Sequence, residues 1–439
     1  MAILECDSFY TLYDSDNKET DRGDCSLKLE EEMLSIMPVM SAPLIVDYRD
    51  IASFAEKDYS LFINFIAGEK LVISNLGYSF DDFLRIFAKL RNKVLLKDLL
   101  MNESIKKSGV KANFECYDSY KDETRKGKCE LRLYETGIVI VPEKDDIKRI
   151  PYSLISKIDT QNYTLTITTN YGDKFTFSMI GTKFDPLIRT LSNVNTELQL
   201  QVQSQLKELL PDEGPLIIRK AGEFMKEGLA AKRSDIESVS QSLWPKLEQK
   251  LKDFEIIEEY NFLKEMSQKE KICIGMKRGL MGDLTGEYIW FLIPIYGKDT
   301  KESGNAIAME ATSEAGKGKA TYFFRIVGRE KYHNLTLKEM DTKTDEFIKT
   351  INHCMLEINF RREPIYLTDE KLNEPRYKQY RYAISKIPSL QKLRNLFIGR
   401  VIHYSEEQWK QDVINLLKFN ANSLKDSEKW SKTQDCDLS

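Results

Sequence analysis

Residues 129–142 read CELRLYETGIVIVP, a stretch with two strand patterns and a turn between them. From Cys129 to Leu133, apolar and polar residues alternate, which is typical of a strand with one buried face. Residues 135–137 contain a threonine and a glycine and can turn the chain, and residues 138–141 are an apolar run that Pro142 ends. The stretch therefore predicts two neighbouring antiparallel strands.

More strands are predicted on the C-terminal side. Strand patterns extend from about Arg149 to Ile158, from Tyr163 to Ile167 and around Phe175 to Phe177, and every link between them is short. Short links favour an antiparallel meander. After Gly181 the spacing becomes that of an amphipathic helix, with apolar residues at Phe184, Leu187, Ile188, Leu191, Val194 and Leu198. We therefore expect six or seven strands followed by one helix.

The same pattern occurs earlier in the chain. Shifting the sequence by 104 positions aligns residues 13–85 with residues 117–189 without a gap and gives about 24 identities. The identities fall at turns as well as at apolar positions, and they include Tyr13, Gly23, Cys25, Leu27, Pro38, Tyr48, Tyr59, Gly68 and Gly77 with their counterparts. We conclude that the chain opens with two copies of one domain.

The order of elements in both copies resembles the pleckstrin-homology (PH) superfold, in which a curved antiparallel sheet is capped by a C-terminal helix. The resemblance covers residues 9–200 and is greatest to GRAM-type and histone-chaperone-type members, which have a stretch similar to Ile150–Ile155 before the middle strands. It rests on element order and hydrophobic pattern, so it implies a fold more than a function.

The second half has a mixed pattern after the break at Pro211–Pro215. Strand-like stretches include Tyr260–Glu265 and Tyr288–Tyr296, a short extended piece follows Pro364, and helices are expected at Ser389–His403 among other places. The predicted fold class is α+β: two tandem PH-like antiparallel β-barrels, each capped by a C-terminal helix, and then an α+β domain with an antiparallel sheet and C-terminal helices. The expected domains are residues 1–104, 105–212 and 213–422, with a disordered tail at 423–439.

The first candidate anion site is the opening hairpin of the second copy, where PH-like domains that hold inositol phosphates carry basic residues. Its cations are Lys121, Arg125, Lys126, Lys128 and Arg132. The first copy lacks this cluster. It has 13 basic and 19 acidic residues in positions 1–108, a net charge of −6, against −1 for positions 109–212. The alternative is an ordinary solvated hairpin.

The second candidate is a basic run with interleaved tyrosines between residues 361 and 400, where ten basic and four acidic residues give a net charge of +6. The residues that we predict to contact an anion are Arg361, Arg362, Arg376, Lys378, Arg381, Arg394 and Arg400. Arginines and tyrosines suit phosphate or nucleic-acid contact, but a solvated helix face with internal ion pairs is the alternative.

Motifs of catalysis and metal binding are missing from the sequence. The three histidines have no metal-ligand spacing, and no nucleophile elbow, kinase motif or dinucleotide fingerprint occurs. The glycine-rich stretches 279–286 and 316–319 are interpreted as turns, and Glu310 with Glu314 offers only weak grounds for a carboxylate pair. Cys25 and Cys129 are expected in the core. We expect no enzyme, no metal and no cofactor.

The whole chain of 439 residues has a net charge of −4, so an anionic partner would need a local site. Few scattered cysteines, no secretory signal at the start and no long apolar run predict a cytoplasmic protein. The function expected is that of a non-catalytic binding or scaffold protein with a protein partner, including capture of a strand at a sheet edge. The alternative is an anion-directed module that binds nucleic acid or phospholipid headgroups through the 361–400 surface. An unrecognised active site in the C-terminal half is a third hypothesis.

Overall fold

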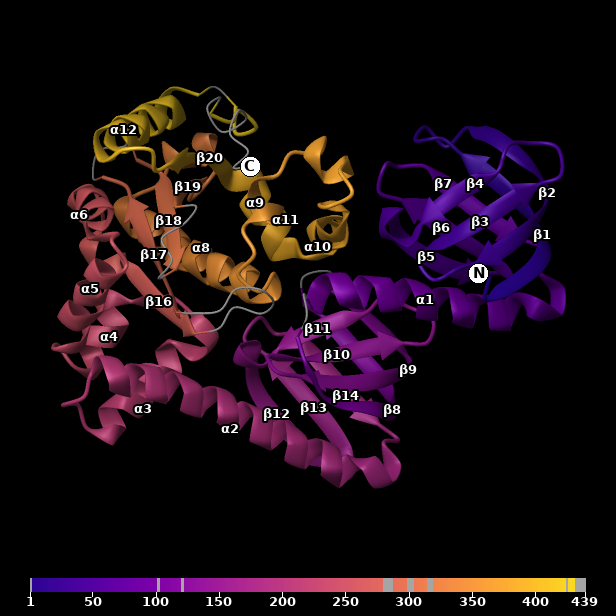
Figure 1. The fold of residues 1–439 in the computed structure, drawn as a ribbon, viewed down its shortest axis with the longest axis horizontal. Coiled ribbons are helices and arrows are strands. Elements are labelled where there is room, and N and C mark those ends of the chain that lie inside the picture. The colour runs from indigo at the N-terminus through magenta and orange to yellow at the C-terminus, as the bar shows by residue number, and fades with distance from the viewer. Residues whose placement is uncertain are drawn as a thin grey trace. The chain divides into compact units, whose positions relative to one another are not determined.

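The computed structural model describes residues 2–100, 103–119, 122–278, 287–297, 304–313, 319–423 and 425–430. The chain forms two compact units, and Figure 1 labels their helices and strands. Unit 1 comprises Met1–Val194 together with Leu367–Lys386, and unit 2 comprises Asn195–Tyr366 together with Ile387–Ser439. The division into three domains that the sequence suggests stays a prediction.

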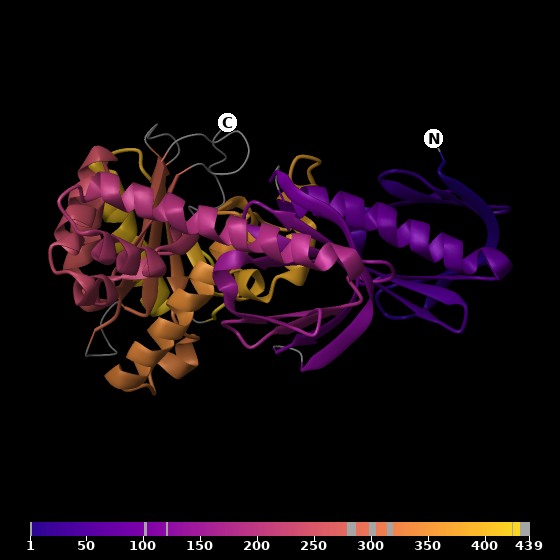
Figure 2. The same cartoon turned by 90° about the horizontal axis from the view of Figure 1, so that it is seen from below.

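Unit 1 contains two curled, seven-stranded antiparallel sheets, each followed by a long helix, as predicted. The first half-barrel comprises β1(Leu4–Tyr13), β2(Glu19–Leu29), β3(Met33–Pro38), β4(Leu44–Asp47), β5(Ile51–Lys57), β6(Ser60–Phe65), β7(Lys70–Ser74) and α1(Phe80–Leu100). The second comprises β8(Ile105–Asp118), β9(Glu123–Tyr134), β10(Gly137–Pro142), β11(Lys148–Pro151), β12(Ile155–Gln161), β13(Thr164–Thr169), β14(Lys174–Ser178) and α2(Phe184–Leu209). The helix α2 is continuous over 26 residues (Figure 2).

The two half-barrels are structural duplicates. Their strand orders are β4-β3-β2-β1-β7-β6-β5 and β11-β10-β9-β8-β14-β13-β12, which correspond strand for strand. The Tyr48 hydroxyl donates to the carbonyl of Glu30 at 3.0 Å, and its counterpart Tyr152 donates to the carbonyl of Tyr134 at 3.1 Å. These matching strand orders and hydrogen bonds confirm the repeat.

Each half-barrel has its own apolar core. In the first, Leu27, Leu61 and Ile63 are fully buried and pack with the helix residues Phe83 and Phe87. Cys25 and Cys129 are each only 4% exposed, as expected for small core residues. Alternating side chains thus cover one face of the curled sheet, and α1 closes it.

Unit 2 is built around a six-stranded antiparallel sheet in the order β15-β16-β17-β18-β19-β20. Its strands are β15(Ala231–Lys232), β16(Cys273–Arg278), β17(Glu287–Ile295), β18(Ala306–Ser313), β19(Ala320–Arg325) and β20(Phe397–Ile402). Its helices are α3(Pro215–Phe224), α4(Arg233–Val239), α5(Leu243–Asp253), α6(Ile257–Glu265), α7(Arg329–Tyr332), α8(Leu337–Glu357), α9(Glu363–Tyr366), α11(Pro388–Leu396) and α12(Glu406–Asn422). The fully buried Trp409 belongs to the core on one face of the sheet.

Three predicted elements of unit 2 were wrong. Tyr260–Glu265 is part of α6, because Tyr260 and Leu263 are buried at helical spacing and acidic residues occupy the first turn. The expected extended piece at residues 365–367 begins within α9. The predicted helix Ser389–His403 ends at Leu396, and its second half is β20, whose apolar residues pair with β19.

The chain continues in contact with unit 2 after α12. The backbone amide of Trp430 donates to the carbonyl of Ile398 at 2.9 Å, and the Trp430 side chain is 8% exposed. Residues 431–439 of the expected tail lie outside the described residues. Among the described helices, none is both long and apolar enough to cross a membrane.

Candidate interaction site in the tandem half-barrels

The helix α1 has two buried faces. Phe83, Phe87, Leu90 and Val94 belong to the core of the first half-barrel. Ala88, Asn92 and Leu95, on another face, are at most 1% exposed and lie outside that core. A helix that covers a single sheet needs only one apolar stripe, so the second buried stripe marks a docking face.

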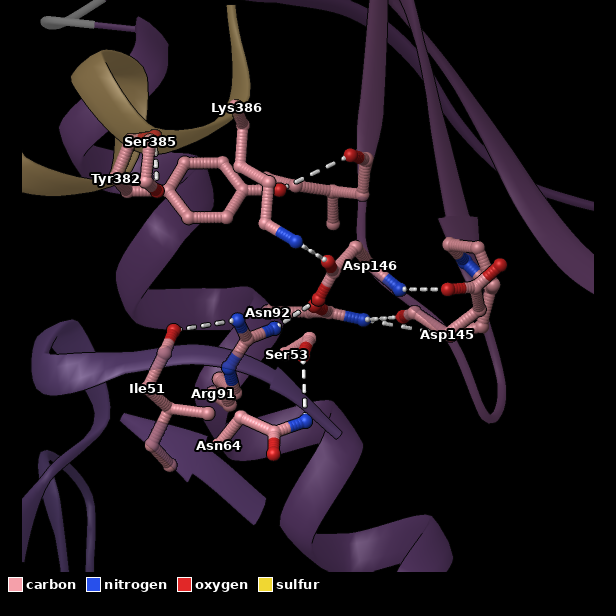
Figure 3. Close-up of polar contacts among 12 residues, drawn as sticks. Ile51, Ser53, Asn64, Arg91, Asn92, Asp145, Asp146, Tyr382, Ser385 and Lys386 are labelled. Atoms are coloured by element: carbon pink, nitrogen blue, oxygen red, sulfur yellow. Dashed lines mark hydrogen bonds and ion pairs between the residues drawn. The ribbon is translucent and has the colours of Figure 1, made fainter. Parts of the chain in front are cut away.

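The loop between β10 and β11, residues 143–147, occupies part of this face, and we call it the second rim loop. Figure 3 shows how its two aspartates meet α1. The amide of Asn92 donates to the backbone carbonyl of Asp145 at 2.9 Å, and the Arg91 guanidinium donates to the Asp146 carboxylate. Arg91 also donates to the carbonyl of Ile51 at 3.0 Å. The two half-barrels are thus joined by a buried polar contact.

Asp146 is the centre of the charge pairing at this joint. The Arg91 side chain is 0% exposed, and Lys386 Nζ lies 2.6 Å from the Asp146 carboxylate (Figure 3). Burial alone would raise the pKa of Asp146, but the charges of Arg91 and Lys386 outweigh it and hold the pKa below its ordinary value. The carboxylate is therefore ionised at neutral pH and compensates a cation that has no access to water.

The segment Leu367–Lys386 completes the joint. It includes α10(Arg381–Lys386) and short 3₁₀ turns at Lys371–Asn373 and Lys378–Tyr380. Tyr382 is 3% exposed and donates to the carbonyl of Ile147 at 3.2 Å, and α10 packs against α1. Both residues that flank the segment belong to unit 2, so this stretch of the later sequence is a structural part of the tandem repeat.

The equivalent loop of the first half-barrel, residues 39–43 between β3 and β4, has a different surface. We call it the first rim loop. The flanking strands pair in equivalent registers, with Ser35 opposite Ile45 and Val139 opposite Arg149. Val39 is 76% exposed and Met40 is 97% exposed. On β4, which follows this loop, Ile45 is 54% exposed. An apolar rim therefore faces solvent where the second half-barrel has an occupied polar contact.

The predicted cations of the β8–β9 hairpin are mostly paired within the same half-barrel. Arg125 lies 3.2 Å from Asp145, Lys126 lies 3.1 Å from Glu115 and Arg132 lies 2.9 Å from Glu130. Lys128 is exposed, and Lys121 lies outside the described residues. The anion site predicted here stays a prediction, and its described cations other than Lys128 have acidic neighbours.

The seven cations predicted between residues 361 and 400 are divided between the units. In unit 1, Lys378 lies 3.5 Å from Asp47, Arg381 pairs with Asp50, and Arg376 lies 3.2 Å from Glu374.

The other four belong to unit 2. Arg362 donates to the carbonyl of Ala311 at 3.0 Å, and Arg394 donates to the carbonyl of Pro364 at 2.8 Å. Arg400 is 6% exposed and lies over the ring of Tyr366, and Arg361 is partly exposed. In both units, most of these cations therefore make ion pairs, hydrogen bonds or ring contacts with residues of the same unit.

A buried charged cluster in unit 2 was not predicted as a group. His403, directly after β20, has Nδ1 at 3.0 Å from Glu259 on α6 and Nε2 at 3.0 Å from Glu310 on β18. Burial alone would lower the pKa of His403, but the two carboxylates raise it to about 9. Thr321 donates to Glu310 at 2.5 Å, and Trp409 donates to Thr321 at 2.9 Å.

This cluster links a helix to the sheet through a protonated histidine. The sequence signal was a glutamate inside the apolar strand 306–311, but the carboxylate proposed as its partner, Glu314, lies outside the described residues. Residues 279–286 and 316–318 of the two glycine-rich stretches also lie outside them. Among the described residues, no group of three or more histidines, cysteines or acids has the geometry to hold a metal ion.

Comparisons with known proteins do not assign the chain to a family. No protein-family model matches the chain, and no curated protein matches it. Among solved structures, the chain is similar to a chain of the Spt16D Pob3N heterodimer, with 13% sequence identity over 38% of this chain and 85% of that chain. The TM-score is 0.16, and a likeness of this degree carries no argument about fold or function.

Proposed function

We propose that this chain is a non-catalytic binding or scaffold protein that recognises a protein partner in the cytoplasm through its tandem PH-like half-barrels. The observation that carries the proposal is the exposed apolar rim of the first half-barrel, with Met40 97% and Val39 76% exposed. Contiguous apolar side chains on a soluble surface are typical of protein interaction sites. The proposed place in the PH superfold is with the GRAM-type and histone-chaperone-type members.

The duplicated design supports the same proposal. Residues shared by the two copies, such as Tyr48 and Tyr152, make internal packing contacts and hydrogen bonds. The rim loops differ in chemistry between the copies, with valine and methionine at 39 and 40 against glutamate and lysine at 143 and 144. A shared core with a changed rim allows one framework to make an internal contact in the second copy and to recognise a partner in the first.

The alternative, an anion-directed module that binds nucleic acid or phospholipid headgroups, ranks below protein recognition. Phosphate binding needs several exposed cations that converge. Most of the described candidates have internal partners, as Arg381 has in Asp50 and Arg125 in Asp145.

The test uses the tagged full-length chain as bait in an extract of its native host. Complexes are collected at low and at high salt, with and without nuclease, and identified by mass spectrometry. We expect a stoichiometric protein partner that survives nuclease and high salt, because apolar contacts do not weaken as phosphate contacts do. Recovery of nucleic acid or anionic lipid alone, lost as salt rises, would overturn the proposal. Arg361→Ala together with Lys128→Ala is the variant that should reduce such anion binding.

A further inference from the structure

We infer that the first rim loop binds an amphipathic helix of a partner protein, and that this helix carries basic residues beside its apolar stripe. The inference rests on the proposed function and adds the class of partner. It is drawn from the contact that the equivalent loop of the second half-barrel makes with α1.

The first step is the occupied contact. The second rim loop is seated on a helix, where Asp145 and Asp146 meet Asn92 and Arg91. Lys144 of the same loop lies 3.2 Å from Asp81 in the first turn of that helix. A rim loop of this half-barrel fold therefore has the shape to lie against a helix.

The second step is the chemistry of the unoccupied loop. Strands β3 and β4 pair in the register of β10 and β11, so residues 39–43 correspond to residues 143–147. Ser41 and Ala42 stand where the two aspartates stand in the copy. Without those carboxylates a partner helix needs no buried arginine. Because Val39 and Met40 are exposed and apolar, a helix that binds them needs an apolar stripe where α1 has Arg91.

The third step is charge. Next to the first rim loop, Asp21 accepts a hydrogen bond from Ser41 at 3.3 Å, and the carbonyl of Asp24 accepts one from the amide of Val39. In the second half-barrel the same positions hold Arg125 and Lys128. The charge beside the loop is therefore negative in the first half-barrel and positive in the second. Residues 1–108 as a whole carry a net charge of −6. Lysines or arginines beside the apolar stripe complement this surface.

A helix from a second copy of this chain fits less well. The docking stripe of α1 contains Ala88, Asn92 and Leu95, whereas the corresponding positions of α2 are Ser192, Thr196 and Gln199. The α2 face is polar where the rim loop is apolar. We therefore assign the site to another protein, and self-association becomes an outcome of the test.

The probe is a labelled 21-residue helical peptide with alanine and leucine at the spacing of residues 88, 92, 95 and 99 and with lysines on both flanks. Binding to the full-length chain is measured by fluorescence anisotropy. We expect saturable binding that Val39→Thr with Met40→Gln weakens at least tenfold, because about two apolar side chains lose their burial. The matched control is Met179→Gln, a methionine that is 80% exposed on the second half-barrel.

Two further peptides test the pattern and the charge. A peptide of the same composition with its stripe scrambled should not bind, and one with glutamates in place of lysines should bind at least tenfold more weakly. Equal binding of the scrambled peptide, or insensitivity to the rim substitutions, would overturn the inference.

The experiments distinguish failure of this inference from failure of the proposed function. If the host extract yields a protein partner that the rim variant retains, the rim assignment fails and protein recognition stands. If no protein partner is recovered and no peptide binds, both fail. A concentration-dependent dimer of the free chain that the rim variant abolishes would replace the partner helix with a second copy.

Discussion

Asp146→Ala should open the joint between the half-barrels by removing the carboxylate that compensates Arg91. The Arg91 side chain is 0% exposed, so water cannot solvate its charge, and an uncompensated buried charge costs about 3–5 kcal/mol. The Lys386 side chain is 27% exposed and can turn to water, so the loss of its ion pair with Asp146 costs only about 0–1 kcal/mol. The backbone tolerates alanine here, because Ala42 occupies the equivalent position in the first rim loop.

The assay is hydrogen exchange of the full-length chain, read by mass spectrometry on peptides from α1 and from residues 367–386. We expect protection there to fall roughly a hundredfold or more, since about 1.4 kcal/mol corresponds to tenfold. The matched control is Glu115→Ala, which breaks an exposed pair with Lys126 and should change protection little.

The double variant Arg91→Met with Asp146→Ala separates charge from packing. Replacing both ions by apolar groups removes the uncompensated charge, so most of the lost protection should return. A double variant no better protected than Asp146→Ala alone would refute the electrostatic account. Because the pKa of Asp146 lies below its ordinary value, the wild-type joint is stabilised above about pH 4 and weakens as the pH falls through the folded pKa.

Three further outcomes are expected. The raised pKa of His403, about 9 against 6.5, means that its stabilisation is complete below pH 6.5 and lost as pH rises to 9. His403→Gln should remove this pH-dependent loss of stability, roughly 3 kcal/mol, from melting curves recorded across that range. Tyr48→Phe and Tyr152→Phe should each cost about 1 kcal/mol in thermal unfolding, because each removes one hydrogen bond from a tyrosine hydroxyl to a backbone carbonyl, and unequal losses would show that the two bonds are not equivalent. Gly275→Ala should abolish soluble expression, because its Cβ would lie 2.6 Å from the carbonyl oxygen of Gly228.

The half-barrels could be predicted because their strand patterns are visible within short stretches of sequence and because the same pattern occurs in two copies. Alternation from Cys129 to Leu133 indicates a strand by itself, and the shift of 104 residues shows that the pattern is a domain. The second unit was harder. Residues 397–402 are a strand only because β19 lies beside them, and a short apolar run after a helix does not carry that information.

The charged sites could be predicted only in part. Lys378 and Arg381 were interpreted as part of a solvent-facing basic surface, yet their partners Asp47 and Asp50 lie more than three hundred residues earlier in the chain. His403 and Glu310 were both considered separately, but 93 residues separate them, and only the sheet brings them together. Residue type predicts charge, whereas pairing depends on tertiary contacts.

The segment Leu367–Lys386 has a consequence for how the protein is made. The two half-barrels are translated before unit 2, but the tyrosine and lysine that complete their joint are Tyr382 and Lys386, which follow most of unit 2 in the sequence. On the ribosome, unit 1 must therefore wait for most of unit 2 to be synthesised before its last contacts can form. A fragment that stops after α2 would leave Arg91 without Tyr382 and Asp146 without Lys386. A fragment designed to contain the complete tandem repeat must therefore also include residues 367–386.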